Sequence, residues 1–542
     1  MSTEQDPTPH PPPPVAATGS RPRWVTGELI ERWCAWVHRD ETRRQPDTAR
    51  PMTALAPFDL SPIAAIPSCV PRDVGSAAAA AAAAQLEWAR TPLARRAEIV
   101  LAFHDLLLAR QRQVLDLIQW ETGKARYHAW QEVAQVATIA RHYARRAGRY
   151  LATRRVRGMV PGLTKVARSR IPKGVVGIVS PWNYPLYLGV GDALPALLAG
   201  NGVVSKADPQ TALTLLWTRD LLNEAGLPPD VWRVVAGDGA VVGGALVDAV
   251  DFVCFTGSTA TGRTVAERAA RRLIGSSLEL GGKNPLIVCE DADVAAAAAG
   301  TAVAAFANTG QMCVHIERVY VQQKVYDAFR DELVRVTGSL RLGRSYDYAC
   351  DIGSLISAER LAAVEAHVDD AVAKGATVLT GGKARPDVGP LFYAPTVLEG
   401  VTPEMDVCGL ETFGPVVSLY RYATDDEAVE LANRGTYGLS ASIWSRNTRR
   451  AVRTAARIRS GSVSVNDGAA ASAGSVEAEM GGMGDSGLGR RHGEEGIRRF
   501  TEAQTVAVQR LLPLRPPPGR SARGFVRRTN GQLALLRRLR VR

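Results

Sequence analysis

The sequence predicts an α/β protein with two doubly wound parallel sheets in tandem. Three observations lead to this fold class. The chain has 542 residues, more than a single hydrophobic core usually serves. Helical sequence dominates up to about residue 150, and short β-rich runs then alternate with helical stretches. Such alternation is typical of parallel sheets that carry helices on their faces.

The first 150 residues predict disorder, then helices. Residues 1–22 are proline-rich, which indicates a disordered segment. Residues 24–39 place apolar side chains at helical spacing and predict a short docking helix. The eight alanines 77–84 predict the first of several long helices, because alanine is the best helix former and amphipathic sequence follows. A low-complexity run is the alternative.

Two sets of strands are expected, and no internal repeat is found. The first set covers residues 174–180, 201–207, 231–237, 251–257 and 276–282, with helices expected at 211–225 and 259–273. The second set covers residues 284–290, 315–322, 376–382, 414–422, 440–445 and 461–467.

The net charge of +12 lies mostly at one end of the chain. Residues 511–542 contain nine arginines and no acid, so the remainder carries +3 and gives no reason to expect a nucleic-acid partner. A membrane-surface helix through residues 531–542 is conceivable. We expect instead a solvated flexible tail, because only one or two helical turns could form an apolar face.

Cysteine usage and hydropathy point to the cytoplasm. The seven cysteines have neither disulfide-like nor metal-like spacing, so we expect reduced thiols and no metal site. The N-terminus lacks the pattern of a signal peptide. The most apolar stretch, 174–204, is interrupted by prolines, glycines and Asp192, so no transmembrane segment is expected.

Three residues are candidates for covalent catalysis. Cys313 in "NTGQMC" is a candidate nucleophile, which would need an oxyanion site and a base. Glu279 in "LELGGK" lies between two leucines, where burial would raise its pKa toward that of a general base. Asn183 in "SPWNYP" could hold an oxyanion together with the backbone N–H of Cys313. Taken singly, each residue is more typical of a core or turn position.

Six motifs occur together in a familiar order. "SPWNYP", "FTGSTATG", "LELGGKNP", "NTGQMC", "ETFGP" and "GGMGDSGLGRRHG" resemble the NAD(P)-dependent aldehyde dehydrogenase superfamily, over residues 55 to 511. The resemblance implies an aldehyde dehydrogenase-like fold with a small β oligomerisation arm and assembly as a homodimer or homotetramer. The implied divisions are an N-terminal extension (1–54), an NAD(P)-binding domain (55–149 and 171–281), a catalytic domain (282–482), the arm (150–170 and 503–512) and a basic tail (513–542).

The resemblance also implies roles for individual residues. Cys313 attacks the aldehyde carbon, Asn183 stabilises the oxyanion, and Glu279 activates the water that releases a carboxylic acid. The residues implied in binding NAD(P) are Pro181, Trp182, Lys206, Gly257, Ser258, Glu411 and Phe413. Residues 237–244, "GDGAVVGG", fail the strict G-x-G-x-x-G fingerprint, which the family also lacks.

Two departures bear on the cofactor and on the motifs. Pro209 occupies the position of a carboxylate that would repel a 2′-phosphate, which favours NADP or dual use, although neighbouring Asp208 could reverse this. Gly484 replaces a lysine that is usual in its motif, without an evident reason.

The chain most resembles actinobacterial succinate-semialdehyde dehydrogenases of a second type. The positions of two substrate-binding arginines known in other succinate-semialdehyde enzymes are Gly191 and Ala307 here. Either another arginine reaches the site, or the substrate is an apolar aliphatic or aromatic aldehyde. His315 and Arg318 are expected to be strand residues that face elsewhere.

Two other classes of function fit the sequence less well. A cysteine hydrolase would need a histidine partner, and none stands out in the sequence. A non-catalytic binding protein of the same fold would be expected to have lost Cys313 or Glu279.

Overall fold

The computed structural model describes residues 21–37, 50–158, 164–468, 474–509, 515–516 and 518–540. The expectation of disorder at 1–22 lies almost entirely outside these residues. By its contacts the chain forms a larger unit, Met1–Tyr150 with Pro172–Phe500, and a smaller unit, Leu151–Ile171 with Thr501–Arg542. The expected boundaries between domains remain predictions.

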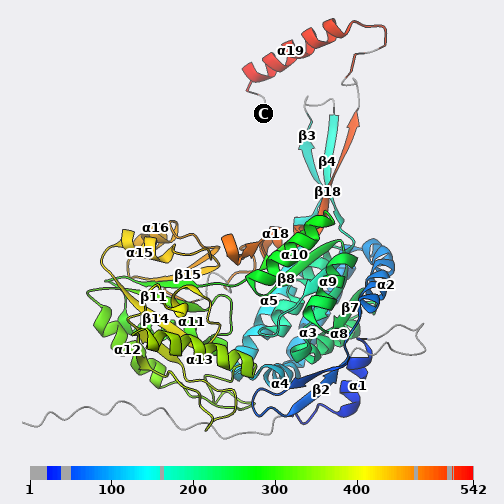
Figure 1. Ribbon diagram of the computed structural model, residues 1–542. Helices are drawn as coiled ribbons and strands as arrows, with labels where there is room; N and C mark the ends of the chain where they lie inside the picture. The colour runs from blue at the N-terminus through cyan, green and yellow to red at the C-terminus, as the bar shows by residue number, and fades with distance from the viewer. Residues whose placement is uncertain are drawn as a thin grey trace, which may run out of the picture. The chain divides into compact units, whose positions relative to one another are not determined.

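The first sheet of the larger unit contains all five strands expected in the first set. Its order is β17-β9-β8-β5-β6-β7, and every neighbouring pair is parallel except β17, which runs antiparallel to β9. The strands are β5 (Val175–Val179), β6 (Gly202–Ala207), β7 (Trp232–Ala236), β8 (Phe252–Thr256), β9 (Gly275–Glu279) and β17 (Gly487–Leu488). The doubly wound prediction is confirmed for this sheet (Figure 1).

The alanine run forms the middle of a long helix that packs on this sheet. Helix α2 contacts β5, β6 and β7, and Ala77, Ala78 and Ala81 are buried. A Cβ at Gly202 would lie 2.7 Å from Ala81 O, so small residues on both sides allow the close approach. The helices of this part are α2 (Pro71–Arg90), α3 (Leu93–Ala109), α4 (Gln111–Thr122), α5 (Arg126–Leu151), α6 (Pro185–Val190), α7 (Ala193–Leu198), η1 (Pro209–Thr211), α8 (Ala212–Glu224), α9 (Gly239–Ala249) and α10 (Thr259–Arg271).

The second sheet has seven strands in the order β12-β13-β14-β11-β10-β15-β16. Only the edge strand β12 is antiparallel to its neighbour. The strands are β10 (Asn284–Val288), β11 (Ile316–Gln322), β12 (Thr377–Thr380), β13 (Thr396–Glu399), β14 (Val416–Tyr422), β15 (Ser440–Trp444) and β16 (Ser462–Val465). Strand β13 was not predicted, because its four residues follow a loop rich in proline and glycine.

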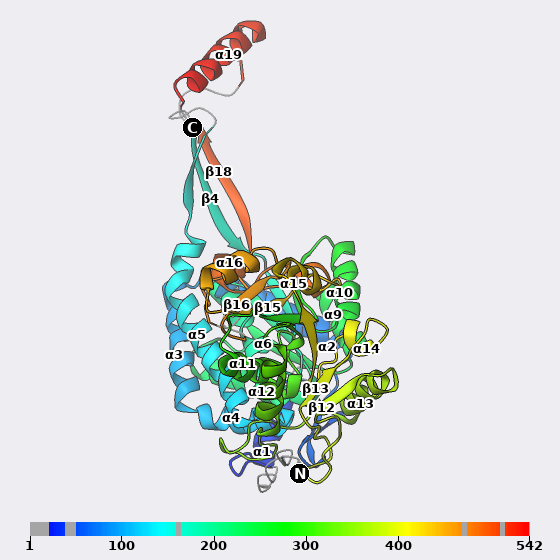
Figure 2. The ribbon, with the colours of Figure 1, turned by 90° about the vertical axis from the view of Figure 1, so that its left-hand side faces the viewer.

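Helices cover both faces of the second sheet. Figure 2 shows α15 and α16 on one side of the strands and α11 and α12 on the other. The helices of this part are α11 (Val294–Phe306), η2 (Ala307–Gly310), α12 (Tyr326–Gly338), α13 (Ala358–Ala373), α14 (Asp406–Gly409), α15 (Asp425–Ala432) and α16 (Thr448–Ala455). The elements η3 (Gly484–Ser486) and α18 (Gly493–Arg498) come later in the chain, and α18 contacts α7 of the first part. The second set of alternating β-rich and helical stretches in the sequence therefore corresponds to a second core, in which a sheet lies between two layers of helices.

The docking helix predicted at 24–39 is present as α1 (Gly27–Ala35). It contacts α8, where Arg32 pairs with Asp220 at 2.7 Å and the indole of Trp33 donates to the same carboxylate. Strands β1 (Met52–Leu55) and β2 (Pro62–Ile66) follow as an antiparallel pair.

The smaller unit consists of a three-stranded sheet and one helix. Strands β3 (Arg154–Arg157) and β4 (Thr164–Pro172) form an antiparallel pair in the region of the arm that the resemblance implies, and β18 (Thr501–Gln509) pairs with β4. The prediction of a flexible tail is wrong, because α19 (Ala522–Arg538) is helical over 17 residues. Arginine, alanine, glutamine and leucine are good helix formers, and the last proline before the helix is Pro518. Among the described helices, none has the length and apolarity needed to cross a bilayer.

Candidate active site

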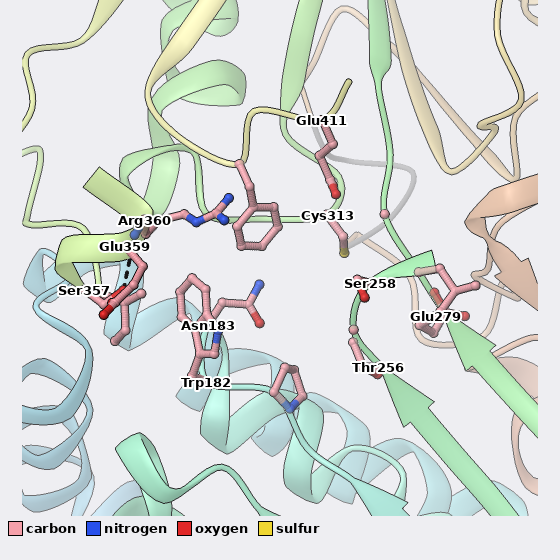
Figure 3. A pocket seen from close by; sticks show the side chains of 16 residues that line it. Trp182, Asn183, Thr256, Ser258, Glu279, Cys313, Ser357, Glu359, Arg360 and Glu411 are labelled. Atoms are coloured by element: carbon pink, nitrogen blue, oxygen red, sulfur yellow. Dashed lines mark hydrogen bonds between the residues drawn. The ribbon is translucent and has the colours of Figure 1, made fainter. Parts of the chain in front are cut away.

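Two cavities of the larger unit meet at Asn183, Thr256, Glu279 and Cys313. The first cavity has a volume of about 360 Å³ and the second about 500 Å³. Thr256 and Glu279 are the last residues of β8 and β9, and Asn183 follows β5. The meeting point therefore lies at the carboxyl ends of parallel strands, where open α/β sheets usually bind ligands. Figure 3 shows these four side chains around the first cavity.

The loop before Cys313 is held in an unusual backbone conformation. Asn308 and Thr309 have positive φ angles of 52° and 58°. Gly310 has a φ of 70°, and a Cβ there would lie 2.0 Å from Gly414 O. The Asn284 side chain donates to the Cys313 carbonyl at 2.8 Å from the other side. Such a conformation persists only where the surroundings impose it, which is common at functional sites.

The Cys313 thiol is neutral at neutral pH. Burial raises its pKa to about 12, and the negative charges of Glu279 and Glu411 act in the same direction. A thiol must lose its proton to become a good nucleophile. Cys313 therefore needs a nearby base at the moment of attack.

Glu279 has the properties of that base. Its carboxylate is 2% exposed, and neither oxygen has a hydrogen-bond partner among the described residues. Burial raises its pKa to about 7, and Arg491 and Arg499 oppose the shift. The burial that the flanking leucines indicated is confirmed. A carboxylate with a pKa near neutrality can take and release a proton at physiological pH.

Asn183 is positioned by a buried ion pair that sequence reasoning missed. Lys124 donates to Glu132 and to the Asn183 carbonyl, both at 2.6 Å. Glu132 also accepts from the backbone N–H groups of Leu186 and Tyr187 at the start of α6. No motif marks these residues, because Lys124 and Glu132 lie in an ordinary amphipathic sequence.

The Asn183 side chain points toward the nucleophile loop. Its Nδ2 donates to the Gln311 carbonyl at 3.0 Å. A primary amide has two N–H donors, so one remains for an anionic oxygen at the cavity junction. Asn183 is 5% exposed, and a donor in so dry a place stabilises developing negative charge strongly.

The first cavity collects six of the seven expected cofactor residues. Pro181, Trp182, Gly257, Ser258, Glu411 and Phe413 line it. Ser258 is the N-cap of α10, so that the free N–H groups and the dipole of this helix favour an anion there. The rings of Trp182 and Phe413 meet edge to face at 5.7 Å between centroids. Lys206 is the exception, because it lies in β6 and is not among the residues that line this cavity.

A buried carboxylate holds the loop that carries Glu411 and Phe413. Glu317 accepts from the backbone N–H of Thr412 at 3.0 Å and of Phe413 at 3.2 Å. Burial opposes its ionisation, but Lys283 and His315 keep its pKa well below the ordinary range. Glu317 is therefore charged and holds the Glu411–Phe413 loop against β11.

The expectation that His315 faces away from the site is confirmed, because it lines neither cavity, although it lies just before β11 and not in the strand. Its ring is fully buried, contacts Met312 O through Nδ1, and packs edge to face on Phe413 at 6.2 Å between centroids. His315 precedes β11 and so links the nucleophile loop to the Phe413 loop. Arg318 also faces away, and its guanidinium donates to backbone carbonyls, among them Lys283 O and Ala432 O.

Replacing Glu317 by Gln should impair the first cavity without removing the nucleophile. Glutamine keeps one acceptor for the Thr412 and Phe413 N–H groups but leaves Lys283 buried without its counter-charge. We expect the KM for the dinucleotide to rise about tenfold, because the loss of one charged hydrogen bond weakens binding by about this factor. Steady-state kinetics with varied cofactor measure this. Glu399→Gln, an acid of the same sheet bonded to Tyr326, is the matched control. Equal effects of both variants would contradict the assignment.

The second cavity is lined mainly by uncharged side chains. Its apolar lining residues include Leu188, Val303, Ala304, Ala307, Met312, Trp444 and Met480. Of the two positions compared with substrate-binding arginines, Ala307 lines the cavity and Gly191 does not. Among the described residues that line it, Arg491 is the only cation.

Arg491, which the sequence analysis did not identify, lines the second cavity. It donates to Asp192 at 2.8 Å and to Thr256 Oγ1 at 2.7 Å, while its buried Nε has no hydrogen-bond partner. Asp192 also pairs with Arg499, so two guanidinium groups share one carboxylate. The cluster therefore retains an excess of positive charge beside Glu279. The only sequence signal was the double arginine of "GLGRRHG".

The structure also explains why a glycine occupies position 484 and shows what the Asp208 carboxylate binds. Gly484 has a φ of 59°, and a Cβ there would lie 2.4 Å from Thr436 O, so this backbone excludes a lysine. Asp208 caps η1 by accepting from Gln210 N at 3.0 Å. Its carboxylate is therefore engaged beside Lys206, and Pro209 begins η1.

Comparison with known proteins identifies the class. The profile of the aldehyde dehydrogenase family matches residues 44–506, so the chain belongs to this family. The family and the chain's relatives are NAD(P)-dependent aldehyde oxidoreductases, which confirms the predicted class of enzyme.

Individual relatives share most of the chain. A protein of Mycolicibacterium smegmatis, provisionally named a succinate-semialdehyde dehydrogenase [NADP(+)], is 51% identical over 454 residues, covering 84% of this chain and 88% of its own length. The crystal structure of a succinate-semialdehyde dehydrogenase from Burkholderia pseudomallei is 34% identical with a TM-score of 0.82, covering 85% and 95%. That of an NAD-dependent aldehyde dehydrogenase from Sinorhizobium meliloti is 35% identical with a TM-score of 0.83, covering 88% and 95%.

Proposed function

We propose that this protein oxidises succinate semialdehyde to succinate with NADP⁺ and that Cys313 is the nucleophile. The observation that carries the proposal is the junction of the two cavities. Cys313, Asn183 and the unpartnered Glu279 carboxylate are the groups that both cavities share, together with Thr256. A thiol, an oxyanion donor and a base at one point suit covalent oxidation of an aldehyde.

In the proposed first half-reaction, Glu279 takes the thiol proton as Cys313 Sγ bonds to the aldehyde carbon. The carbonyl oxygen becomes an oxyanion, which Asn183 Nδ2 and the Cys313 N–H stabilise. When bound in the first cavity, the nicotinamide cofactor supplies the acceptor for the hydride that this carbon loses. A thioester on Cys313 remains.

In the proposed second half-reaction, Glu279 first releases the thiol proton to solvent and then removes a proton from a water molecule that attacks the thioester carbon. The carbon–sulfur bond breaks, the carboxylic acid leaves, and Glu279 returns its proton to the Cys313 thiolate. The pKa of about 7 at Glu279 matches this role, because the carboxylate is ionised in part of the population at neutral pH and can be regenerated.

The first cavity fits a dinucleotide. The start of α10 beside Ser258 offers an anion site, and Glu411 offers a carboxylate for hydroxyl groups near Cys313. Lys206, Asp208 and Pro209 do not line this cavity; Lys206 lies in β6, and Asp208 and Pro209 follow that strand. Asp208 accepts a hydrogen bond from Gln210 N and Pro209 has no charge, so a 2′-phosphate bound beside Lys206 would meet a carboxylate already engaged in a cap. The name of the M. smegmatis relative also favours NADP⁺.

The substrate assignment rests on relatives and on Arg491. Proteins named succinate-semialdehyde dehydrogenases occur among both the sequence relatives and the solved structures. Arg491 provides a cation in the second cavity, and its Nε has no other partner among the described residues. An apolar aldehyde is the second candidate, because most of the lining is apolar and Arg491 is already paired with Asp192.

Initial rates of NAD(P)H formation test these proposals. Succinate semialdehyde and hexanal are each offered with NADP⁺ and with NAD⁺. The proposal expects the highest kcat/KM for succinate semialdehyde with NADP⁺. A preference for hexanal would replace the substrate assignment, and a preference for NAD⁺ would replace the cofactor assignment. No turnover with any pair would contradict the proposed function.

Replacing Arg491 by Gln should separate the two substrates. Loss of a charged hydrogen bond to the distal carboxylate should raise the KM for succinate semialdehyde about 10- to 100-fold. The KM for hexanal should change much less. Arg490→Gln is the matched control, since the Arg490 side chain donates to the backbone carbonyls of Gly482 and Gly489. An equal rise for both aldehydes would mean that Arg491 only supports the fold.

The cellular compartment and the oligomeric state of the enzyme can also be proposed. The seven cysteines are all free thiols, which suits the reducing cytoplasm. We propose that β3, β4 and β18 of the smaller unit pair with a second copy in a homodimer or homotetramer. Light scattering of the purified protein would show a monomer if this is wrong.

A further inference from the structure

Helix α19 is the least packed helix of the described chain. None of its 17 residues is buried. It begins 16 residues after the end of the family match at 506, so the family's common activity does not account for it. A helix of this length gains little stability from its own hydrogen bonds in water. A surface that stabilises it must therefore come from outside the helix.

The side chains of α19 divide into two faces. At 100° per residue, one sector is apolar and the opposite sector is basic. The apolar sector contains Phe525, Val526, Leu533, Leu536 and the C-cap Leu539. The basic sector contains Arg523, Arg527, Arg537 and Arg538, whereas Arg528 and Leu535 lie on the remaining side of the helix between the two sectors. Val526, Leu533 and Leu539 are 53%, 42% and 63% exposed, so the apolar sector faces solvent in the isolated chain.

The charge around α19 has one sign. The smaller unit contains sixteen arginines and lysines and a single acid, Glu502, which gives +15. The whole chain carries +12, so the larger unit is slightly acidic. Arg523 and Arg527 are four residues apart, a spacing at which like charges destabilise a helix in water. An anionic surface would remove this repulsion.

We propose that α19 lies along the surface of an anionic lipid membrane, with its apolar sector among the acyl chains and its arginines at the lipid phosphates. This combination of an apolar face with flanking arginines is what interfacial helices require. With five arginines the helix is too polar to span a bilayer.

Other occupants fit less well. A nucleic acid would use the arginines but would leave Val526, Leu533 and Leu539 in water. A second copy of α19 would cover the apolar sector but would bring two sets of arginines together. Only an anionic lipid surface satisfies both faces of the helix.

Co-sedimentation of the full-length protein with vesicles tests the proposal. Vesicles rich in phosphatidylglycerol should bind the protein at least about tenfold more tightly than phosphatidylcholine vesicles, and added salt should weaken the binding. The double variant Leu533→Gln/Leu536→Gln should lose about tenfold or more of this affinity. Ala534→Gln, which introduces the same side chain on the opposite sector, should bind like the unmodified protein.

Each outcome decides the proposal. Thermal unfolding of the larger unit should be the same in all variants, since α19 has no buried residue. Undiminished vesicle binding by the double-leucine variant would overturn the proposal in favour of charge alone. If the parent protein does not bind vesicles and the double-leucine variant differs from it in size by light scattering, the proposal is overturned in favour of a second copy. Binding to neither kind of vesicle also overturns it.

Discussion

Replacing Cys313 by Ala should abolish aldehyde oxidation, with a fall in kcat of at least about 10⁴-fold. Every proposed covalent state forms on this sulfur, and no other cysteine lines the two cavities. Because the thiol is neutral at rest, its removal takes no charge from the site. The cofactor should therefore bind the variant as it binds the parent protein, within about twofold. Rates of NADPH formation and equilibrium dialysis measure the two quantities.

Cys408→Ala is the matched control for this substitution. Cys408 is also partly exposed, but it packs in a separate core cluster with Tyr420. Its loss should leave turnover within about twofold of the parent. A fall in kcat of much less than about 10⁴-fold in Cys313→Ala would show that Cys313 does not take part in the chemistry. The function of the fold would then not depend on this cysteine.

The sequence predicted the parts of the fold that depend on local pattern. All five strands of the first sheet occur where β-rich runs indicated them, because strands buried on both faces of a parallel sheet are continuously apolar. Strand β13 was missed, since "TVLE" is too short to stand out from its loop. A helix in the basic tail was only the less favoured alternative, because the apolar segment 531–542 is short, whereas α19 begins at Ala522.

Only the site residues that lie within the sequence motifs could be predicted. Cys313, Glu279 and Asn183 meet as expected, but the residues that place them were not foreseen. Lys124, Glu132 and Glu317 are charged groups that the chain buries completely. A single sequence cannot distinguish such residues from surface charges, because their partners come from distant parts of the chain. Arg491 was not predicted for the same reason, because its partner Asp192 is 299 residues away in the sequence.

Replacing Glu279 by Gln should stop both proposed half-reactions. Without the base, the Cys313 thiol keeps its proton and water is not activated, so kcat should fall by about 10² to 10⁴-fold. Because the thiol has to be deprotonated before it attacks, a rapid-mixing experiment should show no burst of NADPH. A burst of about one NADPH per subunit, followed by a slow phase, would contradict the assignment of Glu279 as the base that deprotonates Cys313.

The same substitution should change how the protein responds to pH. In the parent, kcat should rise as the pH passes through about 7, where Glu279 ionises. The Gln variant should lack this step. Stability should show the opposite trend, because a carboxyl group whose pKa is raised by folding stabilises the native state below its unfolded pKa and loses that contribution as the pH rises through the folded pKa.

Relative to Glu279→Gln, the parent should therefore lose stability of order 3 kcal/mol between pH 4 and pH 8, given the pKa shift from 4.5 to about 7. Urea unfolding of both proteins at both pH values measures the difference and cancels the other titrating groups that the two proteins share. An equal effect of pH on both proteins would show that the Glu279 carboxylate is hydrated in the native state. It would then be an ordinary acid, too weak a base at neutral pH to activate water as proposed.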